Sequence, residues 1–182
     1  MRKLIMWNLV TLDGFFEGSA KWDLGFHESV WGAELEQLSL DQLRVADTLL
    51  FGRVTYEGMA GYWATAQGDV ADLMNEISKV VFSATLEQAD WHNTRLVRTD
   101  APEEVARLKG EPGHDLLVFG SAELSAALMR RHLFDEYRLC LAPLVLGAGS
   151  PLFKPAPDPV KMKLLQARPL ESGGVVLRYQ PA

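Results

Sequence analysis

Hydroxyl and guanidinium side chains follow two apolar stretches of this 182-residue chain. Leu116–Phe119 runs directly into Gly120-Ser121 and a helical pattern, and Leu50-Phe51 runs into Gly52-Arg53-Val54-Thr55. Glycine lets a ligand approach the backbone closely, and the first turn of a helix presents free N–H groups to an anion. An arginine guanidinium binds phosphate through parallel hydrogen bonds. These residues are therefore typical of a phosphate-binding site.

Each segment also has an ordinary structural interpretation. Ser121 is a favoured N-cap for a helix that ends in Arg130, Arg131 and His132, so a plain strand-to-helix turn explains this segment equally well. Arg53 could pair with Glu57, four residues further on, while Thr55 caps a helix. Both interpretations stay open at this point.

A third strand end carries hydroxyl groups. Val80-Val81-Phe82 leads into Ser83-Ala84-Thr85, which could bind a ribose or its 2′-phosphate, or could simply start a turn. If this strand lies beside the strand that ends at Gly120, the carboxyl ends of three parallel strands face one crevice. That arrangement would suit a dinucleotide.

A loop rich in glycine and aromatic residues follows the first predicted strand. Asp13-Gly14 ends that strand with a turn, and Asp13 is also a candidate catalytic acid. Trp22 and Phe26 could stack on a planar substrate ring or be buried against the core, and His27 could bind substrate or be structural. Because open α/β sheets bind ligands at the carboxyl ends of their strands, residues 15–29 are the candidate substrate side.

Strands and helices alternate among the elements that must position these residues. Apolar runs predict strands at 3–10, 48–51, 79–83, 95–98 and 116–119. Helical spacing predicts helices at 30–46, 102–109 and from 121, with a helical turn that ends near 58–61. A longer extended run is predicted at 135–146, and residues 161–165 and 175–179 predict an antiparallel pair near the end of the chain. We expect one α/β domain over residues 1–182.

Composition excludes several function classes. A hydrophobic content of 48% is enough for a sizeable core, and the single Cys140 can form neither an internal disulfide nor a cysteine-based zinc site. One cysteine favours a reducing, cytoplasmic setting, and no apolar run approaches the length of a membrane span. The net charge of −6, with scattered cations, disfavours a nucleic-acid partner. Any phosphate must therefore be held by local groups.

The order and spacing of these segments resemble the dihydrofolate reductase-like superfamily, especially its branch related to the reductase domain of bacterial riboflavin biosynthesis. The resemblance spans nearly the whole chain, and its carriers are residues 11–15, 50–57, 79–83, 118–121, 135–137 and 143–149. It implies a three-layer fold whose mainly parallel central sheet has an antiparallel C-terminal edge, with NADPH lying across the strand ends. By motif match, Arg53, Val54 and Thr55 would meet the cofactor phosphates and Ser83 the adenosine end. The segment at the pyrophosphate would comprise Phe119, Gly120, Ser121, Ala122, Glu123 and Leu124.

The resemblance implies an NADPH-dependent reductase of a small planar heterocycle or a ribosylaminopyrimidine-like substrate. Two departures keep alternatives open. Gly120-Ser121 stands where dihydrofolate reductases carry Gly-Gly, and the pterin-binding proline-tryptophan segment and its following helix carboxylate are absent. The alternatives are a true dihydrofolate reductase and a non-catalytic nucleotide- or pterin-binding module. The apolar run at 137–146 could be an interior strand, or it could lie towards the sheet edge and need a cover. The resemblance also implies a homodimer, which would provide that cover.

Overall fold

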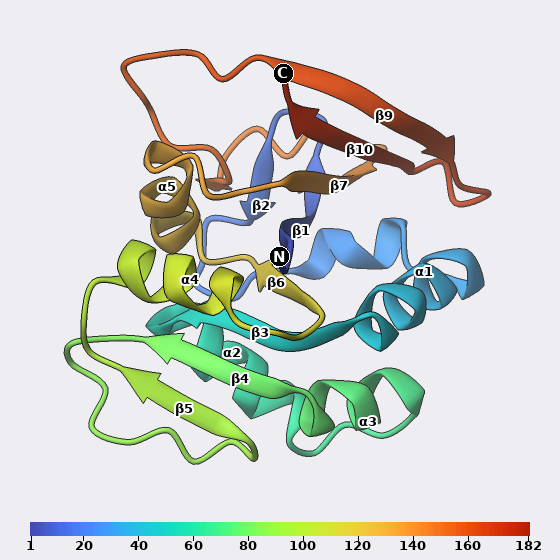
Figure 1. Ribbon diagram of the computed structural model, residues 1–182. Helices are drawn as coiled ribbons and strands as arrows, with labels where there is room; N and C mark the ends of the chain where they lie inside the picture. Colours follow the sequence, from blue (N-terminus) through green and yellow to red (C-terminus); the bar gives the residue numbers. More distant parts are fainter.

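The computed structural model describes residues 1–182 and contains ten strands and five α-helices (Figure 1). The elements are β1 (Leu4–Thr11), β2 (Phe15–Glu17), the 3₁₀ helix η1 (Gly25–Ser29), α1 (Ala33–Arg44), β3 (Ala46–Gly52), α2 (Arg53–Trp63), α3 (Asp69–Glu76), β4 (Ser78–Phe82), β5 (Thr94–Val97), α4 (Ala101–Gly110), β6 (Asp115–Phe119), α5 (Ala122–Arg130), β7 (Glu136–Ala142), β8 (Ser150–Pro151), β9 (Met162–Pro169) and β10 (Val175–Pro181). None of the helices is long and apolar enough to cross a membrane.

Eight of the strands form one sheet in the order β5-β4-β3-β6-β1-β7-β10-β9. The strands from β5 to β7 are all parallel, whereas β10 pairs antiparallel with both β7 and β9. The prediction of a mainly parallel sheet with an antiparallel C-terminal edge is therefore confirmed. β2 and β8 form a separate small ribbon.

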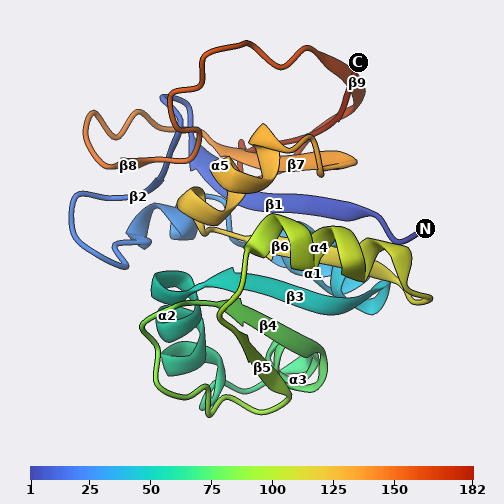
Figure 2. The ribbon, with the colours of Figure 1, turned by 60° about the vertical axis from the view of Figure 1, so that its left-hand side comes forward.

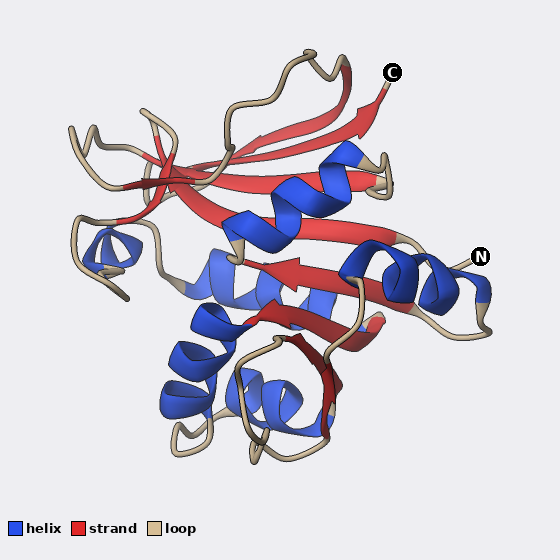
Figure 3. Cartoon of the chain, turned by 90° about the vertical axis from the view of Figure 1, so that its left-hand side faces the viewer, coloured by secondary structure: helices blue, strands red, loops and turns tan.

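Helices cover both faces of the parallel part of the sheet (Figures 2 and 3). Leu4, Met6 and Val118 pack with residues of α4 and α5, whereas Ile5 and Leu117 pack with residues of α1, α2 and α3. Neighbouring residues of a strand point to opposite faces, so a strand covered on both sides must be apolar throughout. This explains the continuous apolar runs and gives the expected three layers.

Several predicted boundaries differ from the structure. The helix expected at 30–46 begins at Ala33, because Val30 is buried beside η1, and it ends at Arg44, because Ala46 already belongs to β3. The loop expected at 15–29 contains β2 and η1. α3 was not predicted, because only Val70, Ala71 and Met74 mark its buried face over eight residues.

One predicted neighbour relationship is wrong, and one open alternative is decided. β4 does not lie beside β6, because β3 lies between them, with Leu50 opposite Val80 on one side and Val118 on the other. Of the two alternatives for the run at 137–146, the interior strand is the one observed, because β7 ends at Ala142 and lies between β1 and β10. The edge on this side of the sheet is β9.

Candidate functional site

Two helices begin side by side at the carboxyl ends of β3 and β6. The backbone N–H of Ser121 donates to Thr55 Oγ1 at 2.9 Å, and Ser121 Oγ accepts from the backbone N–H of Gly52 at 3.0 Å. Each of the two strand-to-helix turns thus supplies a side-chain acceptor for a backbone donor of the other. We call this pair of hydrogen bonds the Thr55–Ser121 clasp, and it joins the start of α2 to the start of α5.

The clasp corrects the predicted role of the Ser121 side chain. Ser121 does occupy the N-cap position of α5, but its hydroxyl forms no capping bond, because it binds Gly52 instead. Its backbone is left-handed, with φ of 53°, and so is that of Gly120, with φ of +51°. A Cβ atom at Gly120 would lie 3.1 Å from Thr55 Cγ2. Glycine therefore satisfies both the backbone conformation and the close approach of Thr55.

The clasp leaves free backbone donors in the first turns of both helices. The N–H groups of Gly120 and Ser121 are occupied, by Asn8 Oδ1 at 2.7 Å and by Thr55 Oγ1. The first turn of a helix lacks intrahelical acceptors, so α5 offers the N–H groups of residues 122–124 and α2 those of residues 53–55. The Thr55 hydroxyl still has its own proton to donate. Two positive helix ends therefore lie side by side, an arrangement that suits an anion.

A small, mainly apolar cavity of about 80 Å³ lies next to the clasp. Its walls include Asn8, Trp22, His27, Thr55, Phe119 and Gly120. Asn8 and Glu17 both line this cavity, although neither was predicted as a site residue from the sequence. Asn8 could have been noticed, because it is the one polar residue in the apolar run from Leu4 to Val10 and it is buried.

The candidate substrate residues come from the segment between β2 and α1. The Trp22 ring lies against α2 at Gly58, where a Cβ atom would be 2.3 Å from the indole. The backbone N–H of Trp22 donates to Glu17 Oε1 at 2.6 Å. His27 lines the cavity, and burial lowers its pKa to about 4, so its imidazole is neutral at pH 7. Phe26 lies outside the cavity wall, in the core beside Val30, with its ring edge-to-face against His27 at 4.7 Å.

The charged and hydroxyl candidates lie around the two helix starts. Arg53 pairs with Glu57 at 3.2 Å, and the same carboxylate lies 3.6 Å from Lys21 of the substrate-side loop. Val54 lines the cavity. Ser83 Oγ accepts from the backbone N–H groups of Thr85 and Leu86, as a residue that starts a turn does. Both ordinary interpretations, the Arg53–Glu57 pair and the Ser83 turn, are thus present in the structure. The cofactor roles of these residues stay predictions.

Asp13 is bound by three donors away from the cavity wall. Its carboxylate accepts from the Thr11 hydroxyl at 2.6 Å and from the N–H groups of Leu146 and Gly147 at 3.1 and 2.8 Å. The Thr11 bond, together with the two backbone bonds, holds the pKa of Asp13 at about 2. Such a group is a poor proton donor near neutral pH. The geometry favours the turn interpretation, and the catalytic role of Asp13 stays an untested prediction.

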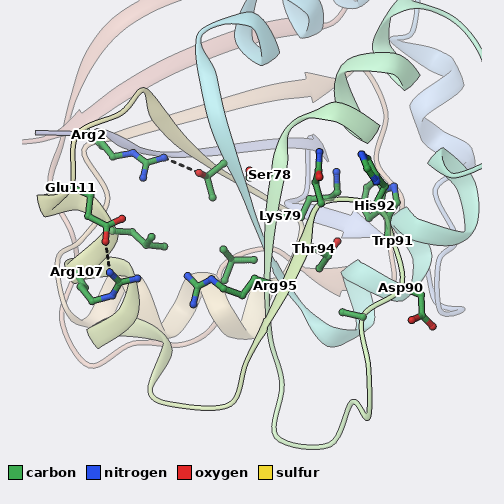
Figure 4. A pocket seen from close by; sticks show the side chains of 15 residues that line it. Arg2, Ser78, Lys79, Asp90, Trp91, His92, Thr94, Arg95, Arg107 and Glu111 are labelled. Atoms are coloured by element: carbon green, nitrogen blue, oxygen red, sulfur yellow. Dashed lines mark hydrogen bonds and ion pairs between the residues drawn. The ribbon is translucent and has the colours of Figure 1, made fainter.

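A larger cavity, about 780 Å³, lies at the amino ends of β4 and β5 (Figure 4). Its cations already have partners within the chain. Arg2 pairs with Asp47, and Arg107 pairs with Glu104 and Glu111. Lys79 Nζ donates to three carbonyl groups at the end of α3 and lies 4.6 Å from the centre of the Trp91 ring. These contacts are structural, so the smaller cavity beside the clasp is the better candidate site.

Comparisons with known proteins agree with this fold. Residues 2–176 match the family of RibD C-terminal domains. The uncharacterised protein YyaP of Bacillus subtilis is 31% identical over 98% of this chain and 94% of its own length. A putative riboflavin biosynthesis protein from Shewanella superposes with a TM-score of 0.81 at 18% identity, covering 99% of each chain. Dihydrofolate reductase from Enterococcus faecalis, solved with NADP(H), superposes with a TM-score of 0.67 at 14% identity, covering 98% of this chain and 96% of that one.

The chain therefore belongs to the RibD C-terminal domain family, a family of riboflavin-pathway reductases with the dihydrofolate reductase-like fold. This confirms the superfamily and the branch expected from the sequence. It also supports an oxidoreductase in general terms.

Proposed function

We propose that this protein is an NADPH-dependent reductase of a small planar heterocycle, of the ribosylaminopyrimidine kind. The observation that carries the proposal is the Thr55–Ser121 clasp, which holds the starts of α2 and α5 together beside a cavity lined by aromatic residues. Two helix starts suit the two phosphates of a pyrophosphate, and the flat apolar walls suit planar rings. Family membership supports reduction as the type of reaction.

The residues at the two helix starts fit a dinucleotide. Residues 122–124 would bind the pyrophosphate through backbone N–H groups, and Val54 and Thr55 would do the same from α2. Arg53, whose side chain is 43% exposed, would turn from Glu57 towards a phosphate. Ser83 would lie at the adenosine end. When bound, NADPH supplies a hydride, and the chain's own residues supply alignment and exclude water.

The substrate side of the proposed site comprises Trp22, His27 and Glu17. Trp22 offers a flat apolar surface, and the Phe26 ring packs edge-to-face against the His27 ring. Because His27 is neutral at pH 7, one of its ring nitrogens can accept a hydrogen bond and the other can donate one. His27 can therefore orient a polar heterocycle without adding charge to an apolar cavity.

The first experiment is titration of the purified protein with NADPH and with NADH, followed by tryptophan fluorescence. Trp7 and Trp22 both line the cavity, so their emission reports on it. We expect NADPH binding, and we expect Arg53→Ala to weaken NADPH more than NADH if Arg53 contacts the 2′-phosphate. Equal losses of affinity for NADPH and NADH would show that Arg53 does not contact the 2′-phosphate. Absence of binding by either nucleotide would overturn the proposed function. NADPH oxidation with dihydrofolate would instead indicate a dihydrofolate reductase.

We further propose that the protein forms a homodimer through β9. This edge strand is exposed along most of its length, and Leu164 and Leu165 are 50% and 43% exposed. Edge strands have unpaired N–H and C=O groups, which a second copy can pair. Light scattering after size exclusion should give a molar mass of twice the chain mass of 20.2 kDa. Leu164→Lys should lower the measured mass towards that of a single chain. A wild-type monomer at micromolar concentration would contradict the proposal.

A further inference from the structure

Asn8 has a buried donor for which the chain supplies no acceptor. The residue is 5% exposed and lines the cavity beside the clasp. Its Oδ1 accepts from the backbone N–H of Gly120 at 2.7 Å, whereas its Nδ2 has no partner. The only other buried side-chain polar atom without a partner is Thr94 Oγ1. An unsatisfied buried donor costs about 1–3 kcal/mol, so its presence in a cavity wall indicates an acceptor from outside the chain.

The orientation of the Asn8 amide follows from its partner. The oxygen and nitrogen of a side-chain amide are told apart by the hydrogen bonds they make. The Gly120 N–H is a donor, so the atom that faces it must be the Asn8 oxygen. The nitrogen is therefore the end left unpaired, and it carries two N–H donors. This assignment does not depend on any other group in the cavity.

We propose that Asn8 Nδ2 donates a hydrogen bond to a carbonyl oxygen of the planar ring bound in this cavity. The proposal rests on the proposed function and names the chemistry that the site selects, which is a ring bearing a carboxamide or a ring carbonyl. In a mainly apolar site, a few polar groups fix the orientation of the ligand. Trp22 and Phe119 provide flat contacts that every planar ring satisfies, whereas Asn8 provides a directional donor.

The Gly120 bond also connects this donor to the phosphate end of the site. Gly120 directly precedes Ser121 of the clasp and the first turn of α5. One amide group thus holds the backbone before α5 through its oxygen and faces the ring ligand through its nitrogen. The carbonyl could come from the carboxamide of the nicotinamide ring or from a pyrimidine substrate, and the experiment separates these two sources.

The test compares wild type with Asn8→Asp and Asn8→Leu by titration calorimetry. Asn8→Asp keeps an acceptor for Gly120 and replaces the donor with a carboxylate oxygen. Asn8→Leu removes both polar ends, so it serves if the buried carboxylate prevents folding. Thr94→Val is the matched control, because it removes the other unpaired buried polar atom, at the amino end of β5. The probes are NADPH, adenosine 2′,5′-bisphosphate, which lacks the nicotinamide ring, and 6-aminouracil added to protein saturated with NADP⁺.

A nicotinamide carboxamide partner predicts that Asn8→Asp loses about tenfold in NADPH affinity and keeps its affinity for the bisphosphate. Asn8→Leu also releases Gly120, so it should lose more affinity for NADPH than for the bisphosphate. A pyrimidine partner predicts unchanged NADPH affinity and an equal loss for 6-aminouracil. Thr94→Val should bind all three probes as wild type does. Equal losses for NADPH and the bisphosphate would overturn the proposal, because Asn8 would then act only by holding Gly120.

The proposal is also overturned if the Asn8 variants bind NADPH as wild type does and, in addition, bind 6-aminouracil as wild type does. The same holds if NADPH affinity is unchanged and wild type does not bind 6-aminouracil. If wild type binds neither nucleotide, the proposed function itself fails. If wild type binds NADPH but the variants show no selective loss, only the role of Asn8 fails.

Discussion

Thr55 and Ser121, 66 residues apart in the sequence, are joined by a buried hydrogen bond from the Ser121 N–H to the Thr55 hydroxyl. The bond fixes the start of α5 against the start of α2, while the Ser121 hydroxyl secures the Gly52 N–H in return. A site that binds two phosphates with two helix starts depends on their separation, so this contact sets the geometry of the whole candidate site.

Thr55→Val should leave the Ser121 N–H without an acceptor at nearly constant side-chain volume. We expect the free energy of unfolding to fall by about 1–3 kcal/mol and nucleotide affinity to fall with it. Thr55→Ser keeps the acceptor and should stay close to wild type in both. Urea unfolding and NADPH titration of the two variants check this. Similar behaviour of Val and Ser would show that the hydroxyl is not needed.

Gly58→Ala should displace Trp22, because the added methyl would lie 2.3 Å from the indole. Gly61→Ala in the same helix is the matched control, because nothing lies within 4 Å of its position. The control should gain about 0.5–1 kcal/mol of stability from the better helix former. Gly58→Ala should lack this gain and shift tryptophan emission to longer wavelength. In a Trp22→Ala background it should recover the gain, and failure to do so would refute the packing argument.

Glu57→Gln should free both Arg53 and Lys21, which share the Glu57 carboxylate. If these cations attract cofactor phosphate, NADPH affinity should rise by up to about fivefold, since exposed ion pairs are worth about 0.2–1 kcal/mol. Raised salt should reduce the gain. Asp72→Asn, on exposed α3 surface, provides a charge-matched control. An affinity that stays equal or falls would argue against Arg53 as a phosphate ligand.

The buried imidazole of His27 should make stability depend on pH. Burial lowers its pKa from 6.5 to about 4, so between these values the unfolded chain binds a proton that the folded chain does not. The free energy of unfolding must therefore fall as pH drops through this window. His27→Gln should flatten the slope of stability between pH 6.5 and 4, whereas His92→Gln, at an exposed histidine, should not. Urea unfolding across this range measures the slopes, and identical slopes for all three proteins would refute the assignment.

Asp13→Asn tests a carboxylate that joins the first turn to the loop at Leu146 and Gly147. The pKa of Asp13 is lowered to about 2, so its contribution to stability is present above the ordinary pKa of 3.8 and is lost as pH falls through about 2. The variant should be less stable at neutral pH and less sensitive to acid in this window. NADPH affinity should be unchanged. A loss of turnover with normal stability would instead support the catalytic role.

Much of the fold could be predicted because its strands are buried on both faces. Leu116–Phe119 contains four consecutive apolar residues, and a run of this length that includes Val and Phe favours a strand covered on both sides. α3 could not be predicted, since eight residues with three buried positions give little periodic signal.

The candidate site was predicted less completely, because its key contacts join residues that are distant in sequence. Gly52 meets Ser121 across 69 residues, and Asn8 meets Gly120 across 112. Spacing along a chain carries no information about such pairs. Residue type did indicate that Gly120 and Ser121 occupy a special turn, but not that the Ser121 hydroxyl would serve Gly52. The partner of the Ser121 hydroxyl depends on the tertiary structure, which brings Gly52 next to it.

The strand order also governs how this protein can be made. β1 precedes the other strands of the sheet in the sequence, yet its neighbours in the sheet are β6 and β7. Its partners therefore emerge only with residues 115–142, while β3, β4 and β5 can associate earlier. Because translation adds about 5–20 residues per second, the apolar strand β1 has no neighbouring strand to pair with for several seconds. A strand that is buried in the centre of the finished sheet is thus exposed and unpaired during translation, and chaperone contact there would protect the nascent chain.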